Sequence, residues 1–154
     1  MRKRLRYLFV GSLLVALSVS ARTGGPFGLG AVLGDPTGLS FKYWHQKDHA
    51  WSGALAFGFH DHHDHQNLIL HVTHQWHDFN LIPETHGSLP GYLGVGGRVY
   101  SGQDFALGVR GCGGLSYVPT RSPVDIFLEL GVVIDFLGHV GGDADGGLGI
   151  RYYF

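Results

Sequence analysis

The residues best suited to chemistry in this 154-residue chain form a run of imidazoles and carboxylates, His60-Asp61-His62-His63-Asp64-His65. Zinc, copper and nickel take such neutral imidazole and carboxylate groups as ligands in proteins. The candidate metal ligands are therefore His60, His62, His63 and His65, with an aspartate of the run completing the shell. No cofactor is expected elsewhere. Two other interpretations stay open, because a polar tract also suits a solvated hairpin and histidine titrates at about pH 6.

A second set of candidates consists of charged side chains that share their side of an alternating segment with small residues. They are Lys42, Arg98, Arg110, Glu129, Asp135 and Arg151. If these sides line the narrow interior of a barrel, the charges must pair, because a lone buried charge costs several kcal/mol. We expect an internal network with Glu129 central among Arg98, Arg110 and Arg151. A selective narrow path or a ligand pocket is the alternative.

Other chemistry has weaker support in the sequence. Asp143 and Asp145 lie among glycines, which favours a turn over a calcium site because the twelve-residue ligand pattern is missing. The single cysteine, Cys112, excludes an internal disulfide and a multi-thiolate metal site. The sequence contains none of the common hydrolase and phosphate-loop motifs. A non-enzymatic role is therefore favoured, with a lipid-modifying membrane enzyme as the remaining alternative.

The elements that position these residues are predicted from the alternation of apolar and polar side chains. Alternating runs separated by turn residues occur at about residues 27–33, 39–44, 51–59, 68–77, 92–100, 105–116, 125–136 and 147–154. Period-two alternation of this kind is typical of an antiparallel meander of strands. The chain is therefore predicted to be all-β, with eight strands of roughly the length needed to cross a membrane at a tilt.

The two sides of the predicted strands differ in a way that indicates which side faces outward. One side is apolar and nearly free of charge, with aromatic residues near its ends at Trp51, Trp76, Phe105, Phe136 and Phe154. The other side carries many glycines and alanines, as a crowded interior requires. This pattern favours an eight-stranded antiparallel up-and-down transmembrane β-barrel whose apolar side meets lipid. His74 is the exception on the apolar side, and a soluble barrel with its polar side outward is the alternative.

The N-terminal residues have the organisation of an export signal. Four basic residues within residues 2–6 precede an apolar stretch over residues 7–19, and Val19 and Ala21 supply the small residues of a cleavage site. We predict a signal peptide over residues 1–21 and a single barrel domain over residues 22–154. Without the leader the chain keeps 7 of its 11 basic residues against 12 acidic ones, which argues against nucleic acid as a partner.

The last residues resemble the C-terminal signal of bacterial outer-membrane β-barrels. Phe154 matches the terminal aromatic residue, Tyr152 the aromatic residue two places earlier, and Gly149 the glycine three places before that. Gly147 departs from the pattern, because a polar residue is usual at that place. Gly149, Tyr152 and Phe154 are therefore the predicted assembly signal.

Taken over the whole mature chain, the pattern resembles the small eight-stranded outer-membrane barrels of Gram-negative bacteria. Such barrels serve as anchors, adhesins, lipid-modifying enzymes or small pores. The resemblance implies a place in the cell outer membrane, contact with its lipids, and passage through periplasmic chaperones and the barrel-assembly machinery. We expect a monomer with a structural or envelope role, and the alternative is a narrow pore or a metal- or ligand-binding barrel.

Overall fold

The computed structural model describes residues 24–58, 67–82, 86–102, 104–138 and 140–154. Its elements are β1 (Phe27–Asp35), β2 (Gly38–Trp44), β3 (His49–Gly58), β4 (Asn67–Asp78), β5 (Gly87–Ser88), β6 (Gly91–Ser101), β7 (Phe105–Pro119), β8 (Val124–Leu137) and β9 (Gly141–Tyr153). The described residues include no helix long and apolar enough to cross a membrane. The predicted leader lies outside the described residues, so its cleavage remains a prediction.

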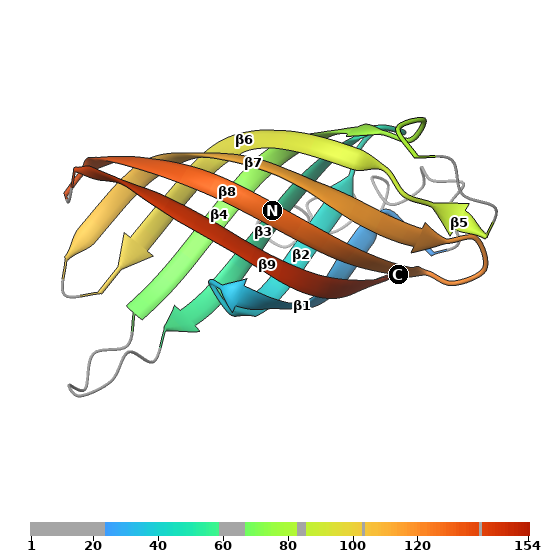
Figure 1. Cartoon of the computed structure of the whole chain (residues 1–154). Coiled ribbons are helices and arrows are strands. Elements are labelled where there is room, and N and C mark those ends of the chain that lie inside the picture. The colour runs from blue at the N-terminus through green and yellow to red at the C-terminus, as the bar shows by residue number, and fades with distance from the viewer. Residues whose placement is uncertain (1–23, 59–66, 83–85, 103, 139) are drawn as a thin grey trace, which may run out of the picture.

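The eight long strands form one closed antiparallel sheet, and the two-residue β5 adds to the end of β7. Each long strand pairs with the next one along the chain, and β1 pairs with β9 to close the ring (Figure 1). The closing seam runs from Gly28 opposite Tyr153 to Asp35 opposite Gly146. The prediction of an eight-stranded antiparallel up-and-down β-barrel is confirmed.

The barrel has two distinguishable ends. We call the end that carries Phe27 and Tyr153 the terminal end, and the end that carries the β6–β7 and β8–β9 connections the hairpin end. Each strand runs obliquely between these two ends (Figure 1). Strand tilt is required for closure of a sheet into a barrel.

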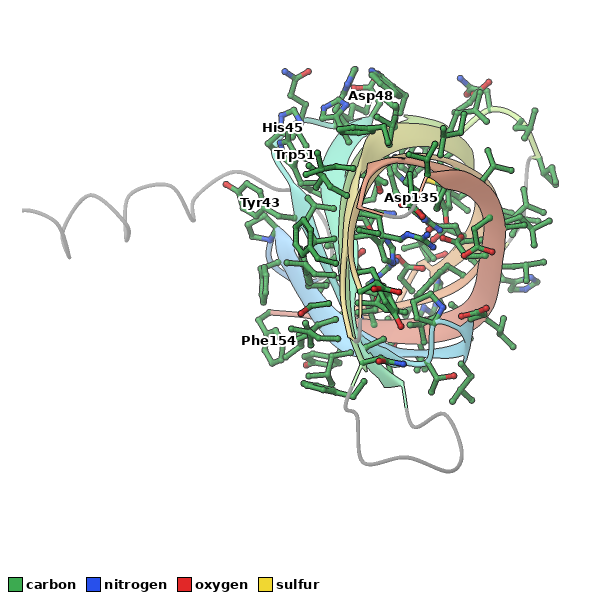
Figure 2. All side chains as sticks on the ribbon, turned by 90° about the vertical axis from the view of Figure 1, so that its left-hand side faces the viewer. Tyr43, His45, Asp48, Trp51, Asp135 and Phe154 are labelled. Carbon is green, nitrogen blue, oxygen red and sulfur yellow. The ribbon has the colours of Figure 1, made fainter. Side chains whose placement is uncertain are left out.

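The strands bury their polar side chains and expose their apolar ones. Along β8, for example, every second residue from Asp125 to Asp135 is buried, Glu129 among them, while the residues that alternate with these are exposed. The outward aliphatic side chains include Leu93, Leu130 and Ile134, which are 70, 68 and 67 % exposed. In the view along the barrel, Asp135 points into the ring and Trp51 and Phe154 point away from it (Figure 2). The facing predicted from alternation therefore holds for these residues.

Two strands extend further toward the hairpin end than the sequence predicted. β1 continues to Asp35, and β9 begins at Gly141 directly opposite Asp135 of β8. The prediction of a glycine turn around Asp143 and Asp145 is therefore wrong, because both residues lie within β9. The glycines suited a turn and a crowded strand equally well. The actual turn includes Gly138, whose φ of 83° favours a residue without a Cβ.

Candidate functional site

The centre of the lumen is occupied by a charged group built on Arg110, Glu129 and Asp145. The Arg110 guanidinium donates to Oε1 of Glu129 at 2.8 Å, and to the two carboxylate oxygens of Asp145 at 2.7 and 2.5 Å. The other carboxylate oxygen of Glu129 accepts from Gln75 Nε2 and from the Tyr92 hydroxyl, both at 2.9 Å. These side chains come from β4, β6, β7, β8 and β9. Apart from the contact between Arg110 and Glu129 on the neighbouring strands β7 and β8, the contacts join strands that are not neighbours in the sheet.

A second charged group lies closer to the terminal end and is centred on Asp125, which is fully buried. Its carboxylate accepts from Ser116 Oγ at 2.6 Å, from the Tyr153 hydroxyl at 2.9 Å and from Arg151 at 3.3 Å. Arg151 also donates to the hydroxyls of Ser40 and Ser52 across the barrel. Its guanidinium lies 3.6 Å from the centre of the Phe127 ring, so both an ion pair and an aromatic face stabilise this cation.

Lys42 belongs to the same end of the lumen and is completely buried. Its Nζ lies 2.8 Å from Nε2 of His77 and 4.0 Å from Oδ2 of Asp125. The ammonium also lies 4.7 Å from the centre of the Trp44 ring and 5.0 Å from that of Tyr92. Polar and aromatic side chains therefore fill the lumen at the terminal end.

A third charged group lies near the hairpin end and is centred on Arg98. Its guanidinium donates to Asp135 Oδ2 at 2.6 Å and to Asp143 Oδ2 at 2.9 Å. Beside it opens a vestibule with a volume of about 1260 Å³. The described carboxylates that line this vestibule are Asp35, Asp104, Asp135, Asp143 and Asp145.

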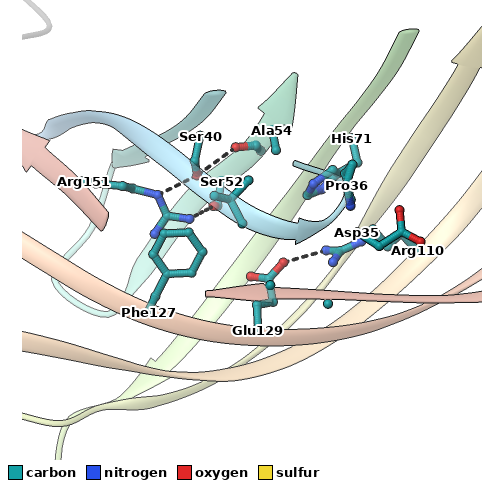
Figure 3. A pocket seen from close by; sticks show the side chains of 14 residues that line it. Asp35, Pro36, Ser40, Ser52, Ala54, His71, Arg110, Phe127, Glu129 and Arg151 are labelled. Atoms are coloured by element: carbon teal, nitrogen blue, oxygen red, sulfur yellow. Dashed lines mark hydrogen bonds and ion pairs between the residues drawn. The ribbon is translucent and has the colours of Figure 1, made fainter. Parts of the chain in front are cut away.

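The vestibule does not continue through the lumen at comparable width. Next to it lies a cavity of only about 20 Å³, lined by His71, Arg110, Phe127, Glu129 and Arg151 among others (Figure 3). A cavity of this volume accommodates about one water molecule. Within the described residues the lumen is therefore a wide mouth that ends at a layer of paired charges.

All six lumen residues named from the sequence have buried side chains inside the ring, but their pairing differs from the expected one. The ion pair of Glu129 is with Arg110, whereas Arg151 pairs with Asp125 and Arg98 pairs with Asp135 and Asp143. Glu129 is therefore not the common partner of the three arginines. The network also includes Asp125, Asp143 and Asp145, which were not among the predicted lumen charges.

A signal for these missing partners was present in the sequence. The six named residues comprise four cations and two carboxylates, an imbalance that a narrow lumen does not tolerate. Asp125 stands on the same side of its strand as Glu129, and Asp143 and Asp145 continue the parity of Arg151. Charge balance together with parity would have identified all three.

The histidine tract at residues 60–65 lies outside the described residues. The metal site at His60, His62, His63 and His65 therefore stays a prediction, to be tested by zinc or copper binding to a variant with these four histidines replaced by alanine. The proposed assembly signal lies at the closing seam, where Phe154 donates its backbone N–H to the carbonyl of Phe27 at 2.9 Å. The Tyr152 and Phe154 rings both face outward, with their centroids 5.1 Å apart.

Comparison with known proteins shows a likeness in fold and none in sequence. No protein-family profile and no curated protein sequence matches the chain. The N-terminal β-barrel domain of OprF from Pseudomonas aeruginosa is similar with a TM-score of 0.51 at 15 % identity, covering 83 % of this chain and 95 % of that one. The attachment invasion locus protein Ail of Yersinia pestis gives 0.46 at 18 % identity, covering 83 % and 93 %. The fold is thus that of the small eight-stranded outer-membrane barrels.

Proposed function

We propose that this chain is a non-enzymatic integral outer-membrane barrel with a sealed lumen and a structural role in the cell envelope. The observation that carries this proposal is the layer of Arg110, Glu129 and Asp145, which closes the lumen below the vestibule. A barrel of eight strands has an interior that side chains just fill, and here those side chains are mutually paired.

The outer surface supports insertion in a lipid bilayer. A band of leucine, isoleucine and valine side chains faces outward around the barrel, and each of the eight long strands pairs with a neighbour on both sides. Closed hydrogen bonding and an apolar outer band are the two properties that hydrocarbon demands of a spanning sheet. The leader and the C-terminal aromatic residues supply the route, through export, periplasmic chaperones and the barrel-assembly machinery, to the cell outer membrane.

The lumen network supports a rigid scaffold. Arg110 connects β7 to β9, Gln75 connects β4 to β8, and Arg151 connects β9 to β2 and β3. Each of these contacts crosses the interior rather than following the sheet ladder. The barrel is therefore cross-braced, which suits an anchor that must keep its shape while presenting its ends to the two aqueous compartments.

Electrical recording from the purified protein in a planar lipid bilayer tests the sealed lumen. We expect no discrete conductance steps, while a general porin reconstituted in the same way conducts. Stable channels whose single-channel current changes in the variant Glu129→Ala would overturn the proposal and indicate a narrow pore. Membrane fractionation and a heat-modifiable band on electrophoresis check separately that the chain is an outer-membrane barrel.

A further inference from the structure

Three histidines gather on the outer face of the barrel near its terminal end. Nε2 of His45 lies 3.0 Å from Nε2 of His74, and the His49 ring lies 5.5 Å from the His74 ring and 6.1 Å from the His45 ring, measured between centroids. All three side chains are half-buried against one another. We call His45, His49 and His74 the outer histidine cluster.

The sheet register explains why residues distant in sequence meet here. His74 of β4 stands opposite Trp51 of β3, and His49 at the start of β3 stands opposite Trp76 of β4. His45 follows the end of β2 in the short connection that leads to His49. The outward side of three adjacent strands thus places the three imidazoles in one group, on the side of the barrel labelled by His45 and Trp51 in Figure 2.

Aromatic side chains flank the outer histidine cluster. The Trp51 and Trp76 rings lie 4.9 and 4.7 Å from the His74 ring, both in edge-on orientations, and both indoles are 45 % exposed. Tryptophans of this kind mark the level of the lipid headgroups on membrane barrels. An imidazole at that level reaches water and dissolved ions, although hydrocarbon begins a short distance away.

We propose that the outer histidine cluster binds a divalent late transition-metal ion, with zinc as the reference case. Two imidazole nitrogens bound to one tetrahedral zinc ion, at the usual Zn–N distance of about 2.0–2.1 Å, lie roughly 3.3 Å from each other. The 3.0 Å separation of the His45 and His74 nitrogens is close to that value. After small rotations of the two rings, both nitrogens bind one metal ion in place of the proton that lies between them.

His49 is the third ligand of the proposed site. No three His, Cys, Asp or Glu side chains of the described residues already surround a single point. Rotation of the His49 side chain is therefore part of binding. Asp48 Oδ1 lies 3.5 Å from Nε2 of His49, close enough to orient that side of the ring once it rotates, with Nδ1 as the nitrogen that faces the ion. A carboxylate behind a ligating histidine is the usual means of orienting the ring.

The competing explanation is that His45 and His74 only satisfy each other's polar nitrogens next to lipid. A hydrogen bond between two imidazoles needs one shared proton and involves neither His49 nor Asp48. Metal binding needs three neutral imidazoles and is therefore lost in acid, since protonated histidine has no lone pair to offer. The two explanations differ in stoichiometry, in pH dependence and in the effect of His49.

Isothermal titration calorimetry of the folded, metal-free protein in detergent tests the proposal. The starting protein carries alanine at positions 60, 62, 63 and 65, so that the histidine tract does not compete. We expect one zinc ion per chain at pH 7.5 and none at pH 5. His45→Gln is expected to weaken zinc binding by at least about 100-fold, since loss of even an outer-shell partner costs about 10–100-fold.

His86→Gln serves as the matched control, because His86 lies on the connection near β5 and outside the cluster. His49→Gln separates a metal site from a hydrogen-bonded pair. A three-histidine site loses zinc affinity in this variant, whereas a hydrogen bond between His45 and His74 does not depend on His49. Cobalt supplies an independent readout through the visible absorbance of a tetrahedral ion. Absence of zinc binding in the starting protein, or equal binding by the His45→Gln and His86→Gln variants, overturns the proposal. Heat-modifiable migration establishes that each variant is folded.

Discussion

At the scale of single residues, the lumen is governed by the cost of burying charge. Glu129 is 6 % exposed and accepts from Arg110, Gln75 and Tyr92, which come from three other strands. Every polar contact of its carboxylate is therefore long-range. Removal of the Glu129 carboxylate leaves Arg110, a buried cation, with Asp145 as its remaining carboxylate partner.

The variant Glu129→Ala is expected to lose about 3–5 kcal/mol of folding free energy, because Arg110 is left buried with a single partner. Urea unfolding in lipid vesicles measures the change. Asp143→Asn is the control, because the Asp143 side chain is 55 % exposed and its pair with Arg98 contributes less than about 1 kcal/mol. Similar small losses in both variants would indicate a lumen filled and screened by water.

Gly149 offers a second test at this scale. A Cβ at this position would lie 2.3 Å from Cζ of Phe127 and 2.6 Å from the carbonyl oxygen of Ala31. Gly149→Ala is therefore expected to cost about 1–3 kcal/mol, as overpacking does in a filled interior. Gly142→Ala is the matched control, since nothing lies within 4 Å of its Cβ position. Equal stability of the two variants in urea would show that Gly149 has no packing role.

At the scale of elements, β9 contributes both to closure of the barrel and to the pairing of charges in the lumen. It pairs with β8 along one edge and with β1 along the other, so it completes the ring between the two termini of the barrel. It also carries the paired charges Asp143, Asp145 and Arg151 on its inner side, and Tyr152 on its outer side. One strand therefore serves closure, lumen pairing and the proposed recognition by the assembly machinery.

The closure and recognition roles of this segment are separable at Phe154, the residue that follows β9. Phe154→Ala keeps the backbone hydrogen bond to Phe27 and removes only an outward ring that is 65 % exposed. We expect unchanged folding into lipid vesicles in vitro but several-fold less assembled barrel in the outer membrane of cells, measured by the heat-modifiable band. Phe136→Ala, which removes another outward ring, is the control. Normal assembly of both variants and of a chain lacking residue 154 would refute the assembly signal.

At the scale of the whole molecule, the barrel reverses the usual distribution of polarity. Its interior contains paired charges and hydroxyls, and its exterior is a continuous aliphatic surface with indoles near one end. In water such a surface would promote association, because soluble monomers rarely expose large apolar patches. In a bilayer the same surface is solvated by hydrocarbon and the charges stay enclosed.

A depth-dependent response to outward charge distinguishes these two solvents. Val132 lies midway along β8 and is 63 % exposed, whereas Val140 lies in the β8–β9 connection and is 76 % exposed. Val132→Arg is expected to cost about 2–4 kcal/mol and Val140→Arg about 0–1 kcal/mol when folding into lipid vesicles is measured. If neither arginine affects stability, the barrel is a soluble one.

The sequence by itself determined the facing of the strands and their number. Side-chain facing is a local property with a period of two, and the small residues on the side that carries Glu129 and Arg151 indicated that this side faces the interior. No knowledge of neighbouring strands was needed for this assignment. The turn residues between runs separated the strands. The ends of strands were less well determined, because glycines around Asp143 and Asp145 suit both a turn and a crowded strand.

Only the tertiary structure decided which groups meet. The partner of Arg98 is Asp143 as well as Asp135, at separations of 45 and 37 residues, and His45 meets His74 at a separation of 29. Such meetings depend on the register between strands and on closure of β1 against β9, which are set by the sum of many ladder contacts. Facing is fixed at each residue, whereas register is a property of the closed ring.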